Sequence, residues 1–373
     1  MSALRTAPTD VPLSASSTSN RRIAGVRPLL SPALLRDELP LRPDAAARVL
    51  AGREAVAGVL SGTDDRLLVL VGPCSVHDPD AALEYAGRLA EAAAAYADRL
   101  AVVMRVYFEK PRSTLGWKGL INDPALDGSF DVNTGLRTAR RLLLQILDGG
   151  LSVGCEFLDP ITPQYIADTV SWGSIGARTA ASQIHRELVS GLSMPVGIKN
   201  STEGDVQVAV DAVRAAAGTH VFTGITEDGV AAILSTTGNS DCHIVLRGSA
   251  SGSNYDEASV ADAVGRLDAA RLPRRLIVDA SHGNSGKDHR RQPAVVRDVA
   301  SRVAAGDHTL AGMMLESFLV AGRQDLDPAD PGRLTYGQSI TDACLAWDET
   351  ADLLGELATA ATRRRAHGAP TEN

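Results

Sequence analysis

Several basic side chains of this sequence could gather around an anionic ligand. The stretch MRVYFEKPRS, residues 104–113, carries Arg105, Lys110 and Arg112, although the whole chain has a formal charge of −8. Further cations end other short apolar segments, namely Arg178, Lys199 and Arg247. Arginine binds phosphate and carboxylate groups in a bidentate way, so converging cations of this kind favour a ligand with several negative charges. The pattern predicts a site for a phosphorylated, acidic metabolite.

A second group of residues has the chemistry of a metal site. Its members are Cys74, His282, Glu316 and Asp342. Thiolate, imidazole and carboxylate ligands suit a divalent transition ion such as Mn²⁺, Fe²⁺, Co²⁺ or Zn²⁺ better than Mg²⁺ or Ca²⁺, which avoid sulfur. Cys74 alone would more often be a small buried hydrophobic residue. The prediction of one divalent metal ion therefore depends on all four residues lying together.

Eight short apolar segments could bring both groups to one place. They are LLVLVGPCS, AVVMRVYF, LSVGCEF, WGSIGAR, MPVGIKN, CHIVLRG, RLIVDASH and TLAGMMLES. Because they alternate with helical stretches over about 250 residues, they indicate a parallel sheet closed into an α/β fold, the (β/α)₈ TIM barrel. In such a barrel all carboxyl ends of the strands face the same mouth, where active sites are built. The segments deliver to it Cys74, Arg105, Glu156, Arg178, Lys199, Arg247, His282 and Glu316.

The barrel does not account for the whole chain. Residues 1–22 are expected to be a disordered N-terminus, and residues 23–66 an N-terminal arm followed by a helix. The catalytic barrel is predicted for residues 67–360, with an inserted β-hairpin at about 220–234. Residues 361–373 are predicted to form a flexible tail.

Composition narrows the class of protein. With 44% hydrophobic residues among 373, the chain can bury a large core. No apolar segment approaches the roughly 18 residues that a membrane span needs, so we expect no membrane partner. The acidic balance argues against nucleic acid as a partner. Four cysteines without CxxC spacing favour a reducing cytoplasm.

One segment imitates a nucleotide-binding loop. HGNSGK, residues 282–287, is similar to part of a P-loop, but Ser281 stands where that loop needs its first glycine. Asp288 also stands where Ser or Thr belongs. The chain has no GxGxxG fingerprint, so dinucleotide chemistry has no support.

Long motifs of the chain resemble, in order, the type I class of 3-deoxy-D-arabino-heptulosonate 7-phosphate (DAHP) synthases. The resemblance runs from about residue 23 to 360. The motifs are GPCSVHDP, MRVYFEKPR, GWKGLINDP, CEFLDPITPQY, WGSIGART, SQIHRELVSGLS, PVGIKN, GNSDCHIVLRG, DASHGNSGK and YGQSITDAC. The family has KPRT where this chain has KPRS, which keeps the hydroxyl group.

This resemblance implies a transferase that condenses phosphoenolpyruvate with erythrose 4-phosphate, the first step of the shikimate pathway. It implies a homodimer or homotetramer. The residues that would hold phosphoenolpyruvate are Arg105, Lys110, Glu156, Arg178, Lys199 and Arg247. Arg112 and Ser113 would hold the tetrose phosphate. The metal ligands would be Cys74, His282, Glu316 and Asp342, and the catalytic group would comprise Lys110, Cys74 and His282.

Three other functions stay open at this point. A class I aldolase would use Lys199 as a Schiff base, but it would leave the predicted metal ligands unused. A related synthase could act on a modified tetrose phosphate, such as an amino sugar, in specialised metabolism. A metabolite sensor that kept the fold without activity is a third reading, although every position required for catalysis is filled.

Overall fold

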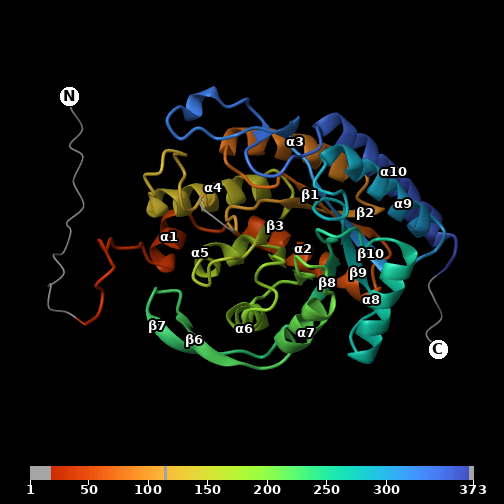
Figure 1. Ribbon diagram of the computed structural model, residues 1–373, viewed down its shortest axis with the longest axis horizontal. Helices are drawn as coiled ribbons and strands as arrows, with labels where there is room; N and C mark the ends of the chain where they lie inside the picture. The colour runs from red at the N-terminus through yellow and green to blue at the C-terminus, as the bar shows by residue number, and fades with distance from the viewer. Residues whose placement is uncertain (1–17, 113–115, 369–373) are drawn as a thin grey trace.

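The computed structural model describes residues 18–112 and 116–368, and its centre is a closed barrel of eight parallel strands (Figure 1). The strand order around the barrel is β1-β10-β9-β8-β5-β4-β3-β2. The strands are β1 (Leu67–Gly72), β2 (Leu100–Arg105), β3 (Ser152–Glu156), β4 (Trp172–Ile175), β5 (Val196–Lys199), β8 (His243–Leu246), β9 (Leu276–Asp279) and β10 (Leu310–Glu316). Each lies within one of the eight apolar segments, except that β2 begins one residue earlier, at Leu100, so the predicted (β/α)₈ fold is confirmed.

Burial on both faces explains why the strands are continuous apolar runs. All residues of β1, β4, β5, β8, β9 and β10 are buried. At the end of β1, a side chain on Gly72 would place its Cβ 2.6 Å from the carbonyl oxygen of Arg105, so glycine lets β1 and β2 approach closely. On its other side β1 pairs with β10, and Gly72 lies opposite Glu316 in this pairing. The carboxyl ends of neighbouring strands therefore finish at one level.

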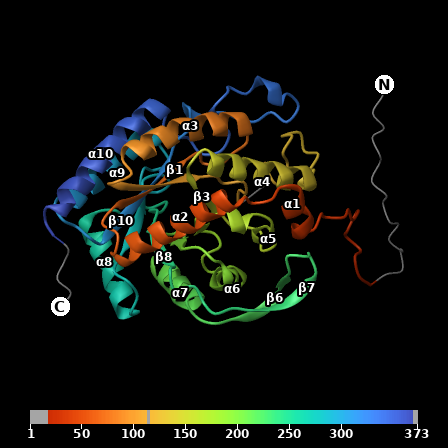
Figure 2. The same ribbon diagram turned by 180° about the vertical axis from the view of Figure 1, so that it is seen from behind.

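Helices surround the barrel, as Figure 2 shows from behind. They are α1 (Pro32–Glu38), α2 (Pro43–Ser61), α3 (Pro79–Ala95), α4 (Val132–Asp148), α5 (Pro163–Ile166), α6 (Gln183–Gly191), α7 (Gln207–Ala216), α8 (Glu257–Ala269), α9 (Gln292–Ala304) and α10 (Trp347–Arg365). Short 3₁₀ turns are η1 (Ala167–Thr169), η2 (His289–Arg291) and η3 (Pro331–Arg333). In the part of the chain described here, none of these helices combines the length and apolar character that a bilayer crossing requires.

Helix α2 covers the amino-terminal end of the barrel, opposite the mouth. Its Val56 and Val59 are buried against Leu68 and Leu70 of β1 in the barrel interior. A Cβ on Gly52 would lie only 2.4 Å from Ser152 Oγ, so the helix packs directly on the start of β3. This end of the barrel is therefore sealed.

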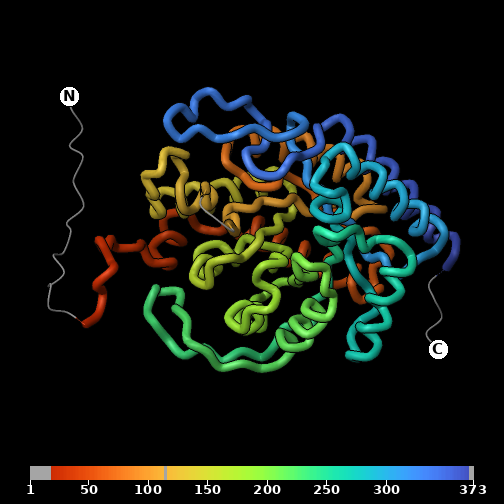
Figure 3. Tube along the Cα trace, in the orientation of Figure 1, coloured from red at the N-terminus to blue at the C-terminus, as the bar shows by residue number. Residues whose placement is uncertain are grey.

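An antiparallel hairpin interrupts the barrel order between α7 and β8, as predicted. Its strands are β6 (Val221–Ile225) and β7 (Ala231–Ser235). Figure 3 shows the hairpin extending past α6 toward the N-terminal segment. At its tip, Ala33 N of α1 donates to the Glu227 carbonyl at 2.8 Å, and Arg36 pairs with the Glu227 carboxylate at 2.7 Å. These contacts join the arm to the hairpin.

The carboxyl-terminal boundary differs from the prediction. Helix α10 continues to Arg365, so residues 361–365 are helical instead of part of a flexible tail. Arg364 is buried, and it donates hydrogen bonds to the Leu310 carbonyl and to the carbonyls of Asp65 and Arg66. These bonds hold the last helical turn against the barrel. The run of three arginines at residues 363–365 did not reveal in the sequence that one of them is buried. Residues 1–17 and 369–373 of the two predicted ends lie outside the described residues.

Two short strands follow the barrel, β11 (Val320–Arg323) and β12 (Gln338–Ser339), which pair in parallel. Both strands belong to the segment between β10 and α10. An isolated bridge between Ser317 and Leu345 returns that segment to the end of β10. This return brings the loop with Asp342 back over the barrel mouth.

The buried His243 near the sealed end makes the stability of the fold depend on pH. Its Nε2 accepts a hydrogen bond from Trp172 Nε1 at 3.2 Å, and burial lowers its pKa to about 4. The unfolded chain therefore binds more protons than the folded chain between pH 6.5 and 4, and stability falls as pH decreases through that window. From pH 7 to pH 5 this histidine should remove about 2 kcal/mol from the free energy of unfolding.

We expect His243→Gln, which keeps an acceptor for Trp172 and cannot titrate, to lose less stability than the unchanged protein over this interval. Urea unfolding of both proteins at pH 7 and pH 5 measures the difference, because all other titrating groups are shared. An equal loss of stability in the two proteins would contradict the prediction.

Candidate active site

A cavity of about 580 Å³ opens at the carboxyl ends of the strands. Eight of the residues singled out in the sequence line it, namely Lys110, Arg112, Glu156, Arg178, Lys199, Arg247, His282 and Asp342. Cys74, Arg105 and Glu316 do not line the cavity and are fully or almost fully buried. Ser113 lies outside the described residues. The barrel thus brings five of the six predicted cations to one cavity, while Cys74, Arg105 and Glu316 lie outside its lining.

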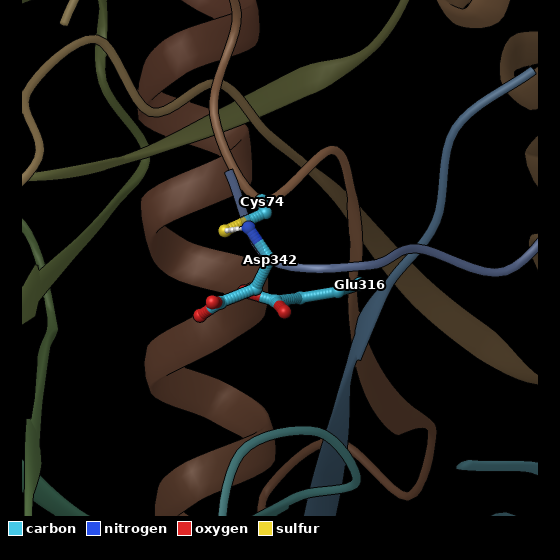
Figure 4. Close-up of side chains that lie close together, drawn as sticks. All are labelled: Cys74, Glu316 and Asp342. Atoms are coloured by element: carbon cyan, nitrogen blue, oxygen red, sulfur yellow. Dashed lines mark hydrogen bonds between the residues drawn. The ribbon is translucent and has the colours of Figure 1, made fainter. Parts of the chain in front are cut away.

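Three predicted metal ligands converge. The ligand atoms of Cys74, Glu316 and Asp342 all lie within 4.8 Å of one another. Figure 4 shows the three side chains close together. Cys74 follows β1 and Glu316 ends the adjacent β10. The backbone N–H of Asp342 donates to Cys74 Sγ at 3.4 Å, which ties its loop to the end of β1. One thiol and two carboxylates at this spacing could hold a metal ion.

His282 stands beside this group. Its Nε2 is 3.7 Å from Glu316 Oε1, and its Nδ1 is 2.9 Å from Asp279 Oδ2. An imidazole that donates its Nδ1–H to Asp279 keeps the lone pair of Nε2 facing Glu316, which is the arrangement of a histidine that binds metal. The fourth predicted ligand therefore lies beside Glu316, outside the group of three ligand atoms that converge.

Asp279, which the sequence reasoning missed, organises two of these elements. Its carboxylate is fully buried and accepts from Lys199 Nζ at 2.7 Å as well as facing His282. Burial favours the neutral acid, but the charges of Lys199 and His282 outweigh it and hold the pKa of Asp279 well below its usual value. The available signal was its place as the last residue of β9, directly before the Ala-Ser-His motif.

Arg105 lies deeper than predicted. Its guanidinium is 1% exposed, contacts Glu316 Oε1 at 3.2 Å, and stacks 4.0 Å from the centre of the Tyr107 ring. Its Nε has no hydrogen-bond partner in the described residues, although it is buried. The sequence position at the end of β2 gave the direction of the side chain but not its depth. Arg105 supports the ligand group from beneath the mouth.

Lys110 connects the metal group with the cavity. Its ammonium donates to Cys74 Sγ and to the Cys74 carbonyl, both at 3.2 Å. Burial disfavours the charged ammonium, but the Cys74 sulfur and the carboxylate of Glu156 outweigh it and raise the pKa of Lys110. A protonated lysine at this point is both a charge and a proton source at the edge of the cavity.

The opposite side of the cavity is strongly cationic. Arg247 is 7% exposed, and its backbone is held by a hydrogen bond to Asn200 Oδ1 at 2.8 Å. Burial lowers the pKa of Arg247, and the neighbouring charge of Arg178 lowers it further. Two guanidinium groups that repel one another beside a cavity favour an anion between them.

Two further features complete the cavity. Arg112 is oriented by the hydrogen bond from its Nε to the Trp117 carbonyl at 2.8 Å. A side chain on Gly176 would place its Cβ 2.3 Å from Glu156 Oε1, so glycine leaves room for that carboxylate. Lys287 also lines the cavity. It lies in a family motif, DASHGNSGK, and in a failed P-loop, but it was not predicted as a site residue.

Comparisons with a family model, with known proteins and with solved structures all point to the same family. The sequence model of the DAHP synthetase I family matches residues 40–355. The chain is 54% identical over 357 residues to the phospho-2-dehydro-3-deoxyheptonate aldolase of Corynebacterium glutamicum, covering 94% of this chain and 97% of that protein. It is 52% identical over 344 residues to the Phe-sensitive aldolase of that name from Escherichia coli, covering 92% of this chain and 97% of that protein. The solved structure of a Francisella tularensis phospho-2-dehydro-3-deoxyheptonate aldolase superimposes with a TM-score of 0.90 at 47% identity, covering 92% and 99% of the two chains.

The grouped ligands generate a test of metal binding. We expect Cys74→Ala to weaken Co²⁺ binding at least about 100-fold and to abolish the near-ultraviolet absorption of a cobalt–thiolate bond, because the only sulfur of the group is lost. Titration calorimetry and absorption spectra measure both effects. Cys242→Ala, at a buried cysteine outside this group, is the matched control. An unchanged cobalt spectrum in Cys74→Ala would show that the thiol is not a ligand.

Proposed function

This chain belongs to the DAHP synthetase I family, and we propose that its barrel mouth condenses phosphoenolpyruvate with erythrose 4-phosphate. The products are DAHP and inorganic phosphate, and the reaction is the first step of the shikimate pathway toward chorismate and the aromatic amino acids. The observation that carries this function is one cavity in which a cationic side meets a group of thiol, imidazole and carboxylate ligands.

The cationic side is suited to phosphoenolpyruvate. In this proposal Arg178, Lys199 and Arg247 bind its phosphate and carboxylate groups from the cavity wall. Each charge-assisted hydrogen bond stabilises the complex by roughly 1.5–3 kcal/mol. Arg105 acts from below, and Lys110 and Glu156 border the reacting end of the molecule. An anion near Arg178 and Arg247 would reduce the repulsion between the two guanidinium groups.

The second substrate requires its own anion site. We assign its phosphate to Arg112, which lines the cavity on the loop after β2. Ser113, which the family resemblance also assigns to this phosphate, lies outside the described residues. The cations also offset the repulsion between two highly charged substrates, which must reach contact distance before a carbon–carbon bond can form.

One divalent ion fits the residues present. Cys74, His282, Glu316 and Asp342 would hold it, and the sulfur ligand favours Mn²⁺, Fe²⁺, Co²⁺ or Zn²⁺. When bound, the ion supplies Lewis acidity to the aldehyde oxygen or to a water molecule. Asp279 fixes the orientation of His282, and Arg105 holds the carboxylate of Glu316.

The reaction follows from this placement. C3 of phosphoenolpyruvate attacks the aldehyde carbon of erythrose 4-phosphate, water adds at C2, and phosphate leaves by cleavage of its C–O bond. Lys110 can donate a proton to the aldehyde oxygen as negative charge develops there, since its ammonium reaches the cavity beside Cys74. Lys199 and Arg247 hold phosphoenolpyruvate in place while the bond between its C3 and the aldehyde carbon forms.

A class I aldolase mechanism is disfavoured by the surroundings of Lys199. Its nitrogen is held in an ion pair with the buried carboxylate of Asp279 at 2.7 Å. A Schiff base would have to break this pair, because the same nitrogen must bond to the substrate carbon. A synthase for a modified tetrose phosphate would differ only in its contacts to the sugar. The experiment therefore also tests an amino tetrose phosphate as the second substrate.

We expect the purified, remetallated protein to consume phosphoenolpyruvate and release phosphate in equal amounts when erythrose 4-phosphate is added. Loss of the enol absorbance and a phosphate assay follow the two together. EDTA should abolish turnover and a divalent ion should restore it. Turnover only with an amino tetrose phosphate would contradict the proposed substrate, and substrate-dependent inactivation by borohydride would favour the aldolase.

The hairpin suggests how copies of the chain associate. Its outward face carries Val221, which is 68% exposed, and Ile233, which is 76% exposed, and the nearby Val230 is 61% exposed. The arm adds Ile23 and Val26 as further exposed apolar side chains. Apolar surface of this kind marks an interface, and we propose that a second copy covers it, in a homodimer or homotetramer. The four buried free cysteines agree with a cytoplasmic location.

We expect light scattering after gel filtration to give an oligomer for the unchanged protein and a smaller species for the double variant Val221→Asp, Ile233→Asp. Each carboxylate would be desolvated in the interface without a partner. Leu50→Asp, on α2 and 56% exposed, is the control that should leave the oligomer intact. A monomeric unchanged protein would refute the interface.

A further inference from the structure

The loop after β9 holds a lysine in an unusual backbone conformation. Gly286 and Lys287 have φ angles of +63° and +62°, both in the left-handed region. Glycine adopts that region freely, whereas a lysine does so at a cost in backbone free energy. The backbone N–H of Lys287 donates to the His282 carbonyl at 2.6 Å, which closes the turn. A residue kept in a strained conformation at a cavity suggests that its side chain has a use there.

The side chain of Lys287 faces the cavity without a partner. It lines the cavity of about 580 Å³ and also a small recess that includes His282 and Asp342. Within residues 18–112 and 116–368, its ammonium makes neither a hydrogen bond nor an ion pair. The next cation of the same loop, Arg290, instead pairs with Asp288 at 2.8 Å and is 78% exposed. Lys287 is therefore available to a ligand.

The position of Lys287 relative to other charges indicates which ligand group it meets. Lys287 lines the cavity together with Arg112, although the two residues belong to loops after β9 and β2. Lys287 also lines the small recess with His282, Glu316 and Asp342. Arg178 and Arg247, which we assign to phosphoenolpyruvate, do not line that recess. Lys287 therefore belongs to the side of the cavity that lies next to the metal group.

We propose that Lys287 is a substrate-binding residue that contacts the phosphate of the aldehyde substrate, opposite Arg112. This inference rests on the proposed function and extends its tetrose-phosphate site to a second loop. A flexible ammonium with three donors is suited to a mobile phosphate group. The left-handed turn places the Lys287 ammonium at the rim of the cavity. The contact with the ligand is the reason why the chain keeps a lysine in this unfavourable backbone conformation.

Two substitutions separate the side chain from the backbone. Lys287→Gly removes the ammonium and relaxes the left-handed backbone, so it should melt at the same temperature as the unchanged protein or higher. It should nevertheless raise KM for erythrose 4-phosphate at least about tenfold, with KM for phosphoenolpyruvate within about twofold. Lys287→Arg keeps the charge and should restore most of the affinity. Arg290→Gln removes a cation of the same loop and is the control.

Inorganic phosphate provides a second readout. At saturating phosphoenolpyruvate, its inhibition constant against erythrose 4-phosphate should rise about tenfold in Lys287→Gly and stay unchanged in Arg290→Gln. An unchanged KM for erythrose 4-phosphate in an active Lys287→Gly, a rise confined to phosphoenolpyruvate, or a lower melting temperature would overturn the inference. Failure of the unchanged, remetallated protein to turn over would instead overturn the proposed function.

Discussion

The buried carboxylates beneath the barrel mouth are the constraint on which the site depends. Asp279 and Glu316 end adjacent strands and are at most 1% exposed, so each must be compensated by charge. Asp279 is paired with Lys199 and His282, while Glu316 contacts Arg105. A cation that binds a buried carboxylate cannot also move freely. The same ion pairs that make burial tolerable therefore fix the directions of the groups that meet substrate.

This arrangement divides the mouth into layers with different tasks. The lower layer contains Arg105, Asp279 and Glu316 and is closed to solvent. The upper layer lines the cavity, and its cations outnumber the carboxylates available to them. Lys110 joins the layers through its contact with Cys74. The charges of the lower layer neutralise one another, whereas the upper layer has an excess of positive charge. Two phosphorylated substrates would neutralise this excess with their own negative charges.

Elements outside the barrel close or extend this core without forming the site. Helix α2 seals the end opposite the mouth, and α10 is held there by the buried guanidinium of Arg364. The hairpin and the arm contact one another through Glu227 and Arg36 but lie apart from the cavity lining. Their exposed apolar faces are the surface on which we propose that copies of the chain associate, whereas the barrel mouth is where the reaction takes place.

Sequence reasoning reached the barrel and its strands because residues buried on both faces must be apolar, and each such run stops where the chain turns polar. The types of residue at those ends, such as Arg178 and Glu156, were visible for the same reason. Depth was not visible. Arg105 and Arg247 occupy equivalent strand ends, yet one lies beneath the cavity and the other lines it.

The sequence by itself therefore determined the fold class and the chemical types collected at the mouth, since both follow from local alternation of apolar and polar residues. Only the tertiary structure decided the partners: Asp279 pairs with Lys199, eighty positions away, whereas the Lys287 ammonium has no partner among the residues that the structure describes. Strand register and loop backbone angles set those distances, and they arise from closure of the whole barrel. No local segment contains that information.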